Sequence, residues 1–307
     1  MEIRKMVAMS SPSGKSTREC IYFTVEYNHY RDVSDSKTSG IRDREEIQTC
    51  ECVLCLPESY TADGEETPLI LSFHGAGGRV CCEDHLVGGV DSVQNLIDAG
   101  YAALDVCGSE THGVTLGCPE HIFAAYKAYR YAIKHYNLSD KVHVFGVSMG
   151  GQVAMNFTNT FPSAVWTVGM FFPRLNIEGI TVEDRYCIGI WDKTYPAGDC
   201  PTVTDLIRKV YRFTGSQWSN ETTNGFNPYR TRSFRNESGE RVVIPPCPIK
   251  IWQGTDDLVV DPLITEEFVR SVRRSGSYIE LHMMEGMGHC FTPEMCTELL
   301  YWFNRFR

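Results

Sequence analysis

The sequence contains no apolar run as long as a membrane span. A helix that crosses the lipid core needs roughly 20 consecutive, mostly apolar residues, and none of the 307 residues belongs to such a run. The first residues carry charges at Glu2, Arg4 and Lys5 and lack the continuous apolar core of a secretion signal. We therefore expect a cytoplasmic protein with no membrane partner.

Positive charge is also scarce. Lys and Arg together number 29 against 39 Asp and Glu, which gives a formal net charge of -10. Nucleic-acid surfaces depend on clustered Lys and Arg side chains that neutralise phosphates. The composition therefore argues against a nucleic-acid partner and favours a small molecule.

A complete phosphate-binding loop is missing as well. The segment from Gly14 to Thr17 reads Gly-Lys-Ser-Thr, but the loop pattern needs glycine at position 9, where the chain has Met9. No strand is predicted before it, and the chain has no internal repeat. We expect no cofactor.

Cysteine is abundant, at 13 residues, but its number is odd and no secretion signal precedes it. This usage is typical of reduced thiols. Some cysteines, with one histidine, could bind zinc: Cys50, Cys52, Cys55, Cys81, Cys82 and His85. Cys50 and Cys52 share one face of a predicted strand, which suits a packed core as well. We predict no metal site.

Strand-like and helix-like segments alternate along most of the chain. The predicted strands are 19–27, 46–57, 68–73, 101–106, 142–145, 165–172, 249–253 and 278–284, and the predicted helices are 91–99, 121–136, 152–160, 262–275 and 291–306, with a turn at 137–140. Such alternation predicts an α/β fold with a mostly parallel central sheet and helices on both faces. The first two strands would form an antiparallel entry to the sheet.

The alternation fails between residues 173 and 246. This stretch is rich in Gly, Asn, Arg and aromatic residues and contains one amphipathic helix pattern, at 202–213. Long irregular stretches inside a compact domain are usually lids or binding loops. We therefore interpret residues 1–307 as a single domain in which 173–246 form a lid-like cap or substrate-loop insertion. Its aromatic residues could bind a sugar or aromatic acyl group, or form a small core of their own: Trp191, Trp218, Phe226 and Tyr229.

A nucleophile pattern follows the strand predicted at 142–145. Gly146-Val147-Ser148-Met149-Gly150 stands between this strand and a helix-compatible segment. The order of strand, sharp turn and helix lifts a serine hydroxyl above the end of a parallel sheet. Gly146 and Gly150 leave room where a side chain would strike the neighbouring backbone. Ser148 is the candidate nucleophile.

A base and an acid follow at later strand ends. Glycine-flanked His289 comes just after the last predicted strand, so it lies at the same edge of the sheet as Ser148. The acid should come from the strand end between them, where Asp256, Asp257 and Asp261 are available. Asp261 precedes a proline that opens a helix and is better explained as an N-cap. Spacing does not decide between Asp256 and Asp257; we favour Asp257.

The loop from His74 to Gly78 is the candidate oxyanion site. Negative charge that develops on a carbonyl oxygen needs preorganised N–H donors. The predicted pair is the amide of Ala76 or Gly77 together with that of Met149, the residue after the nucleophile.

These motifs, in this order, resemble those of the α/β-hydrolase superfamily, and within it the prolyl-oligopeptidase-like and small-ester esterase branches. The resemblance covers the chain from about residue 68 to the end. Acid loops in those branches commonly read Gly-x-x-Asp-x-x-Val, which falls on Gly254, Asp257 and Val260. The resemblance implies a catalytic triad of Ser148, Asp257 and His289 and metal-independent hydrolysis through an acyl-enzyme.

We therefore expect a carboxylesterase that acts on a small ester or an acylated carbohydrate. Two alternatives stay open. A prolyl-oligopeptidase-like peptidase would use the same three side chains, and a non-catalytic binding protein could retain the fold without the activity.

Overall fold

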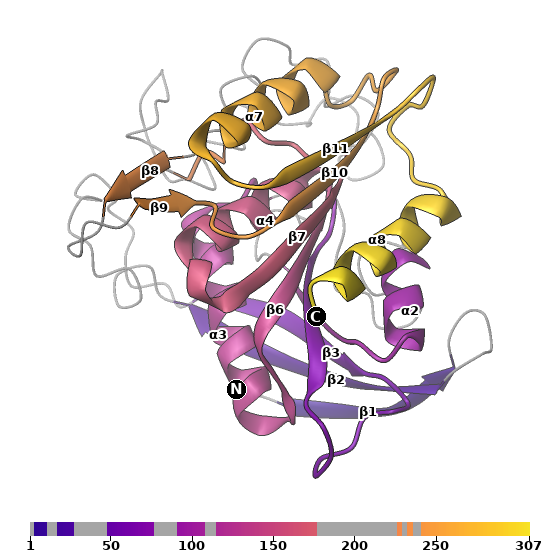
Figure 1. Cartoon of the computed structure of the whole chain (residues 1–307). Helices are drawn as coiled ribbons and strands as arrows, with labels where there is room; N and C mark the ends of the chain where they lie inside the picture. Colours follow the sequence, from indigo (N-terminus) through magenta and orange to yellow (C-terminus); the bar gives the residue numbers. More distant parts are fainter. Residues whose placement is uncertain are drawn as a thin grey trace, which may run out of the picture.

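The computed structural model describes residues 3–10, 17–27, 48–76, 91–107, 115–176, 226–228, 232–235 and 241–307. Its main sheet contains nine strands, and helices cover both faces (Figure 1). The strands of this sheet are β1 (Ile3–Ser10), β2 (Thr17–Tyr27), β3 (Gln48–Leu56), β4 (Thr67–Phe73), β5 (Ala102–Val106), β6 (Leu138–Val147), β7 (Val165–Phe171), β10 (Ile249–Gly254) and β11 (Ile279–Met284). The helices are α2 (Asp91–Asp98), α3 (Pro119–His135), α4 (Met149–Thr160), the 3₁₀ helix η2 (Pro162–Ala164), α7 (Pro262–Ser275) and α8 (Pro293–Arg305).

The strand order is β1-β2-β3-β5-β4-β6-β7-β10-β11. Every pair from β5 to β11 is parallel, whereas β1, β2 and β3 pair antiparallel and β3 meets β5 antiparallel. The predicted mostly parallel sheet with an antiparallel entry is confirmed. The carboxyl ends of β4, β6, β7, β10 and β11 therefore meet at one edge, where the loops that follow them can share a site.

Two apolar clusters hold the helices on the sheet. Helices α3, α4 and α7 pack on one face, and α2 and α8 pack on the other (Figure 1). Side chains alternate between the faces along each strand. In β10, Ile249 and Ile251 belong to the cluster of Phe268 on α7, whereas Trp252 belongs to that of Leu299 on α8. Among the described helices, none has the length and apolarity to cross a bilayer.

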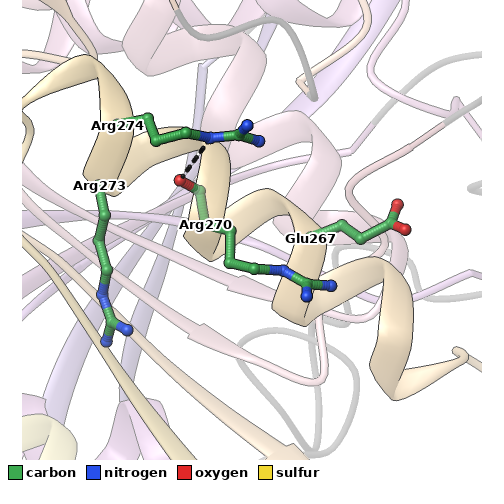
Figure 2. A pocket seen from close by; sticks show the side chains of 4 residues that line it. All are labelled: Glu267, Arg270, Arg273 and Arg274. Atoms are coloured by element: carbon green, nitrogen blue, oxygen red, sulfur yellow. Dashed lines mark hydrogen bonds between the residues drawn. The ribbon is translucent and has the colours of Figure 1, made fainter.

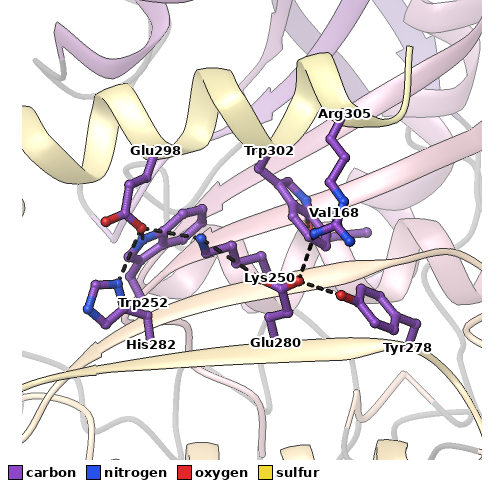
Figure 3. Close-up of polar contacts among 9 residues, drawn as sticks. All are labelled: Val168, Lys250, Trp252, Tyr278, Glu280, His282, Glu298, Trp302 and Arg305. Atoms are coloured by element: carbon purple, nitrogen blue, oxygen red, sulfur yellow. Dashed lines mark hydrogen bonds and ion pairs between the residues drawn. The ribbon is translucent and has the colours of Figure 1, made fainter.

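Polar contacts fix α8 on the last two strands (Figure 3). The carboxylate of Glu298 accepts a hydrogen bond from Trp252 Nε1 at 2.7 Å and from Lys250 Nζ at 3.2 Å, and it lies 3.2 Å from Nδ1 of His282. Since α8 follows the loop that contains His289, these contacts also constrain the end of that loop.

Some boundaries differ from the prediction. The turn predicted at 137–140 is wrong, because β6 already begins at Leu138, which pairs with Thr67. Polar Ser139 and Asp140 lie at the half-exposed start of the strand, where burial does not demand an apolar pattern. The small sheet of β8 (Arg232–Arg235) and β9 (Arg241–Ile244), within residues 173–246, was not predicted. Because residues 177–225 lie outside the described ranges, the cap interpretation stays a prediction.

The cysteines of β3 lie in the core. Cys50 and Cys52 are each 1% exposed and belong to the same apolar cluster. None of the described cysteines, Cys107 and Cys118 included, belongs to a disulfide. Cys81, Cys82 and His85 lie outside the described residues. Within the described ranges, no group of three or more His, Cys, Asp or Glu side chains is arranged to hold a metal ion.

Candidate active site

Ser148 occupies a strained turn between β6 and α4. Its backbone has φ 54° and ψ -119°, a conformation that residues other than glycine rarely adopt. Its N–H donates to Phe171 O at 3.0 Å, and its carbonyl oxygen accepts from the N–H groups of Gly151 at 3.0 Å and Arg174 at 2.8 Å. Bonds to β7, to α4 and to the segment after β7 thus hold the serine in this conformation.

The glycines around Ser148 are needed for close backbone contacts. A Cβ on Gly150 would lie 2.1 Å from the carbonyl oxygen of Phe73, and one on Gly146 would lie 2.4 Å from that of Gly150. Both distances are far below van der Waals contact. The sequence prediction that these positions leave room for the turn is confirmed.

The three predicted triad side chains come together at the carboxyl edge of the sheet. Ser148 Oγ lies 3.0 Å from Nε2 of His289, and Nδ1 of His289 lies 2.8 Å from Oδ2 of Asp257. They follow β6, β11 and β10, respectively. The Asp257 side chain has no exposed surface, whereas that of His289 is 17% exposed. The arrangement is a continuous hydrogen-bonded chain from a buried carboxylate to a serine hydroxyl.

The environment of Asp257 favours its ionised form. Burial alone would raise the pKa of this carboxyl, but hydrogen bonds from His289 and from the N–H groups of Val260 and Val259 outweigh it and lower the pKa. The main-chain bonds to Oδ1 measure 2.9 and 2.8 Å. An ionised Asp257 accepts the Nδ1–H of His289, which leaves Nε2 free to accept the hydroxyl proton of Ser148.

The other two candidate acids point elsewhere. Asp256 is exposed, and its Oδ1 accepts a hydrogen bond from Thr255 Oγ1 at 3.1 Å. Asp261 caps α7 by accepting from the N–H of Leu263 at 2.9 Å, as predicted. Of the three, Asp257 is the one that reaches His289.

The loops that carry the acid and the base pack directly on each other. The N–H of Asp256 donates to Met287 O at 2.9 Å, and that of Thr255 donates to Met284 O at 3.0 Å. A Cβ on Gly254 would lie 2.1 Å from Met287 O. The short distance between Asp257 and His289 therefore depends on this backbone contact.

The predicted oxyanion loop lies beside Ser148. A Cβ on Gly75 would lie 3.6 Å from Cβ of Ser148, and half-buried Ala76 follows at once. Met149 is the first residue of α4, so the helix offers its N–H no carbonyl partner. Gly77 lies outside the described residues. The oxyanion role of Ala76, Gly77 and Met149 stays a prediction.

Sequence reasoning missed an aromatic surface next to the histidine. The centroid of the Phe172 ring lies 4.3 Å from that of the His289 ring. The Phe291 ring is stacked on the Phe172 ring, with 6.3 Å between centroids and 13° between planes. Phe291 is 37% exposed. The only sequence signal was position, since Phe172 ends the strand predicted at 165–172 and Phe291 follows His289 by two residues.

The predicted substrate-binding aromatics fall mostly outside the described chain, as Trp191, Trp218 and Tyr229 do. Phe226 is half-buried and packs against the core cluster of α3 and α4. Its carbonyl oxygen accepts from Asn156 Nδ2 at 2.8 Å. A substrate-binding role for these four residues stays a prediction.

A separate pocket lies on α7 (Figure 2). The described residues that line it are charged: Glu267, Arg270, Arg273 and Arg274. Arg274 Nε donates to Arg270 O at 3.3 Å, within the same helix. Ser148, Asp257 and His289 are not among the described residues that line this pocket.

No protein-family model matches the chain, and no curated protein matches it in sequence. Solved structures do match its fold. The rice cell wall degrading esterase LipA from Xanthomonas oryzae has a TM-score of 0.65 and 14% identity over 100% of this chain and 98% of its own. The Pyrococcus horikoshii acylaminoacyl peptidase has a TM-score of 0.58 and 11% identity over 99% of this chain and 47% of its own. A Mycobacterium tuberculosis puromycin-hydrolyzing peptidase has a TM-score of 0.55 and 16% identity over 84% of this chain and 37% of its own.

The TM-scores show a likeness of fold, and identities this low carry it no further. The chain has the α/β-hydrolase fold, which serine esterases and peptidases share. It spans less than half the length of the two peptidase chains.

Proposed function

We propose that this chain is a serine hydrolase that cleaves carboxylic esters through an acyl-enzyme. One observation carries the proposal: Ser148, His289 and Asp257 are joined by hydrogen bonds of 3.0 and 2.8 Å. A nucleophile, a base within reach of its proton and a carboxylate that orients the base are what acyl transfer by serine requires.

In the first half of the reaction, Ser148 Oγ attacks the substrate carbonyl carbon while Nε2 of His289 takes the hydroxyl proton. The carbonyl oxygen becomes negative and is stabilised by the N–H of Met149 and that of Ala76 or Gly77. The tetrahedral intermediate then collapses. Its bond to the leaving oxygen breaks, Nε2 gives its proton to the departing alcohol, and the acyl group stays on Ser148.

In the second half, Nε2 of His289 takes a proton from water, and the resulting hydroxide attacks the acyl carbon. Collapse breaks the bond to Ser148 Oγ, which recovers its proton from the imidazolium. The products are a carboxylic acid and free enzyme. Asp257 keeps its negative charge throughout and stabilises the imidazolium that forms in each half.

The fold comparison supports an ester substrate. LipA, a cell wall degrading esterase, is matched over 98% of its chain, which supports a small or carbohydrate-linked ester. The exposed Phe291 ring near His289 could contact an apolar part of such a substrate. In this proposal, residues 173–246 supply further substrate contacts, with Trp191, Trp218, Phe226 and Tyr229 as candidates.

A peptidase is the second candidate, because two of the fold neighbours are peptidases. Turnover of p-nitrophenyl acetate should be compared with that of alanine and proline p-nitroanilides, in wild type and Ser148→Ala. We expect wild type to prefer the acetate and Ser148→Ala to lose at least about 10³-fold in kcat. Preferential anilide turnover would favour the peptidase, and absence of turnover would favour a binding protein.

A further inference from the structure

Strand β10 has a buried polar side chain next to its last residue, where its pattern calls for an apolar one. Ile249, Ile251 and Gln253 share the face that packs on α7, and Gln253 is 0% exposed. Burial of a primary amide in a core is unfavourable unless the amide is hydrogen-bonded. Its bonds therefore indicate what this residue does.

Both ends of the amide are engaged. Nε2 of Gln253 lies 3.0 Å from Oδ2 of Asp257, 3.3 Å from Gly254 O and 3.5 Å from Val260 O. Oε1 accepts the hydroxyl proton of Thr265 on α7 at 2.9 Å. The Asp257 carboxylate and the carbonyl oxygens of Gly254 and Val260 only accept hydrogen bonds, so the amide must turn its N–H donors toward them and its oxygen toward the Thr265 hydroxyl.

The contact with Asp257 falls on the same oxygen that His289 uses. Oδ2 therefore has two donors, Nδ1 of His289 and Nε2 of Gln253. Without Gln253, Oδ2 would keep one side-chain donor among the described residues, Nδ1 of His289, and the carbonyl oxygens of Gly254 and Val260 would remain in the same buried site. The two main-chain bonds hold Oδ1, so loss of the Gln253 donor would weaken the hold on Oδ2, the oxygen that His289 uses.

We propose that Gln253 is a positioning residue that holds the carboxylate of Asp257 toward His289, and that Thr265 holds Gln253. The inference rests on the proposed function, since it needs Ser148, His289 and Asp257 to act together. Gln253 reaches the reaction through Asp257 alone. Its loss should lower kcat and leave KM unchanged.

A double-mutant cycle on kcat with p-nitrophenyl acetate tests the chain of contacts. In the full chain, Gln253→Met should lower kcat by about 10–100-fold, the equivalent of a lost hydrogen bond to a charged group. Thr265→Val should lower kcat less. The double variant should be no slower than Gln253→Met alone, because Thr265 acts only through Gln253.

Thr167→Val is the matched control. Thr167 is also 0% exposed and hydrogen-bonded, to Nδ1 of His143 at 2.9 Å, but it does not touch the triad. This variant loses a comparable buried bond and should retain wild-type kcat. Wild-type kcat in Gln253→Met, or losses that add in the double variant, would overturn the proposal.

A readout independent of turnover separates this inference from the proposed function. If wild type turns over no ester, the function fails, yet positioning can still be read from the ring N–H proton of His289 by NMR of ¹⁵N-histidine-labelled protein. The signal is identified by its absence in His289→Gln. We expect it in wild type and Thr167→Val and expect Gln253→Met to lose it through exchange with water; its persistence in Gln253→Met would refute the positioning role.

Discussion

Asp256 and Asp257 are adjacent in sequence, and their carboxylates lie in opposite environments. Asp256 is exposed and bonded to Thr255, whereas Asp257 is buried and accepts bonds from His289, Gln253 and two main-chain N–H groups. Two residues of one type can therefore differ completely in what they do. Substitution of one aspartate should therefore affect kcat differently from substitution of the other.

Asp257→Asn should lower kcat by about 10³–10⁴-fold, because an amide in place of the carboxylate favours the wrong tautomer of the histidine. Asp256→Asn is the control and should stay within about twofold of wild type, as surface substitutions usually do. Steady-state kinetics on p-nitrophenyl acetate gives both values. Equal losses in the two variants would mean that Asp257 does not orient the base.

At the scale of elements, the site depends on how the ends of β10 and β11 pack. The loop after β10 contacts the loop after β11 through main-chain bonds and through the close approach at Gly254. This contact brings Asp257 and His289 together across 32 residues of sequence. Backbone packing, more than any side chain of the two loops, thus sets the geometry.

Gly254→Ala should destabilise the protein by about 3 kcal/mol, the upper part of the range for overpacking, because the new Cβ would meet backbone 2.1 Å away. Gly288→Ala is the matched control in the partner loop, where a Cβ would lie 3.8 Å from Asp256 O. Urea unfolding measures both. Similar stability of the two variants would contradict the account of this packing.

Asp261 stabilises helix α7 and takes no part in the proposed reaction. Its side chain caps α7, so Asp261→Ala should cost about 1 kcal/mol of unfolding free energy. The kcat should stay at the wild-type value because Asp261 does not touch His289. A large loss of kcat with unchanged stability would reverse this assignment.

Sequence patterns predicted the strands and helices whose buried residues recur at a regular spacing. The strands and helices of the two apolar faces were predicted, and the motif order placed Ser148, Asp257 and His289 on loops that do meet. Edge strand β1 was missed because its main-chain pairing with β2 does not appear as a pattern in the sequence. Gln253 was missed because its role depends on Thr265, which comes from another element.

At the scale of the whole molecule, buried histidines link stability to pH. Burial lowers the pKa of His143 to about 4, helped by the charge of Arg307. Burial also lowers that of His121 to about 3, helped by His74 and opposed by a hydrogen bond to Val106. These folded values lie below the ordinary histidine value of roughly 6.5, so the unfolded chain takes up protons first as the pH falls. The stability that depends on keeping these two histidines neutral is fully present above about pH 6.5. It is lost progressively as the pH falls from there toward their folded pKa values.

His143→Asn should reduce this acid sensitivity. Each such histidine lowers the unfolding free energy by about 1.4 kcal/mol per pH unit between its unfolded and folded pKa values. Removing one should make the slope shallower by that amount between about pH 6.5 and 4.5, whatever the variant's stability at pH 7. Urea unfolding across this range measures the slope. His135→Gln, at an exposed site on α3, is the control, and equal slopes in both variants would contradict the account.

The central claim is that Ser148 is a nucleophile activated by His289 and Asp257. Reaction with a fluorophosphonate probe tests it most directly, because the probe forms a covalent bond with an activated serine and needs no knowledge of the substrate. The account predicts one label on each folded wild-type chain and none on Ser148→Ala. No labelling of folded wild type, or undiminished labelling of Ser148→Ala, would contradict it.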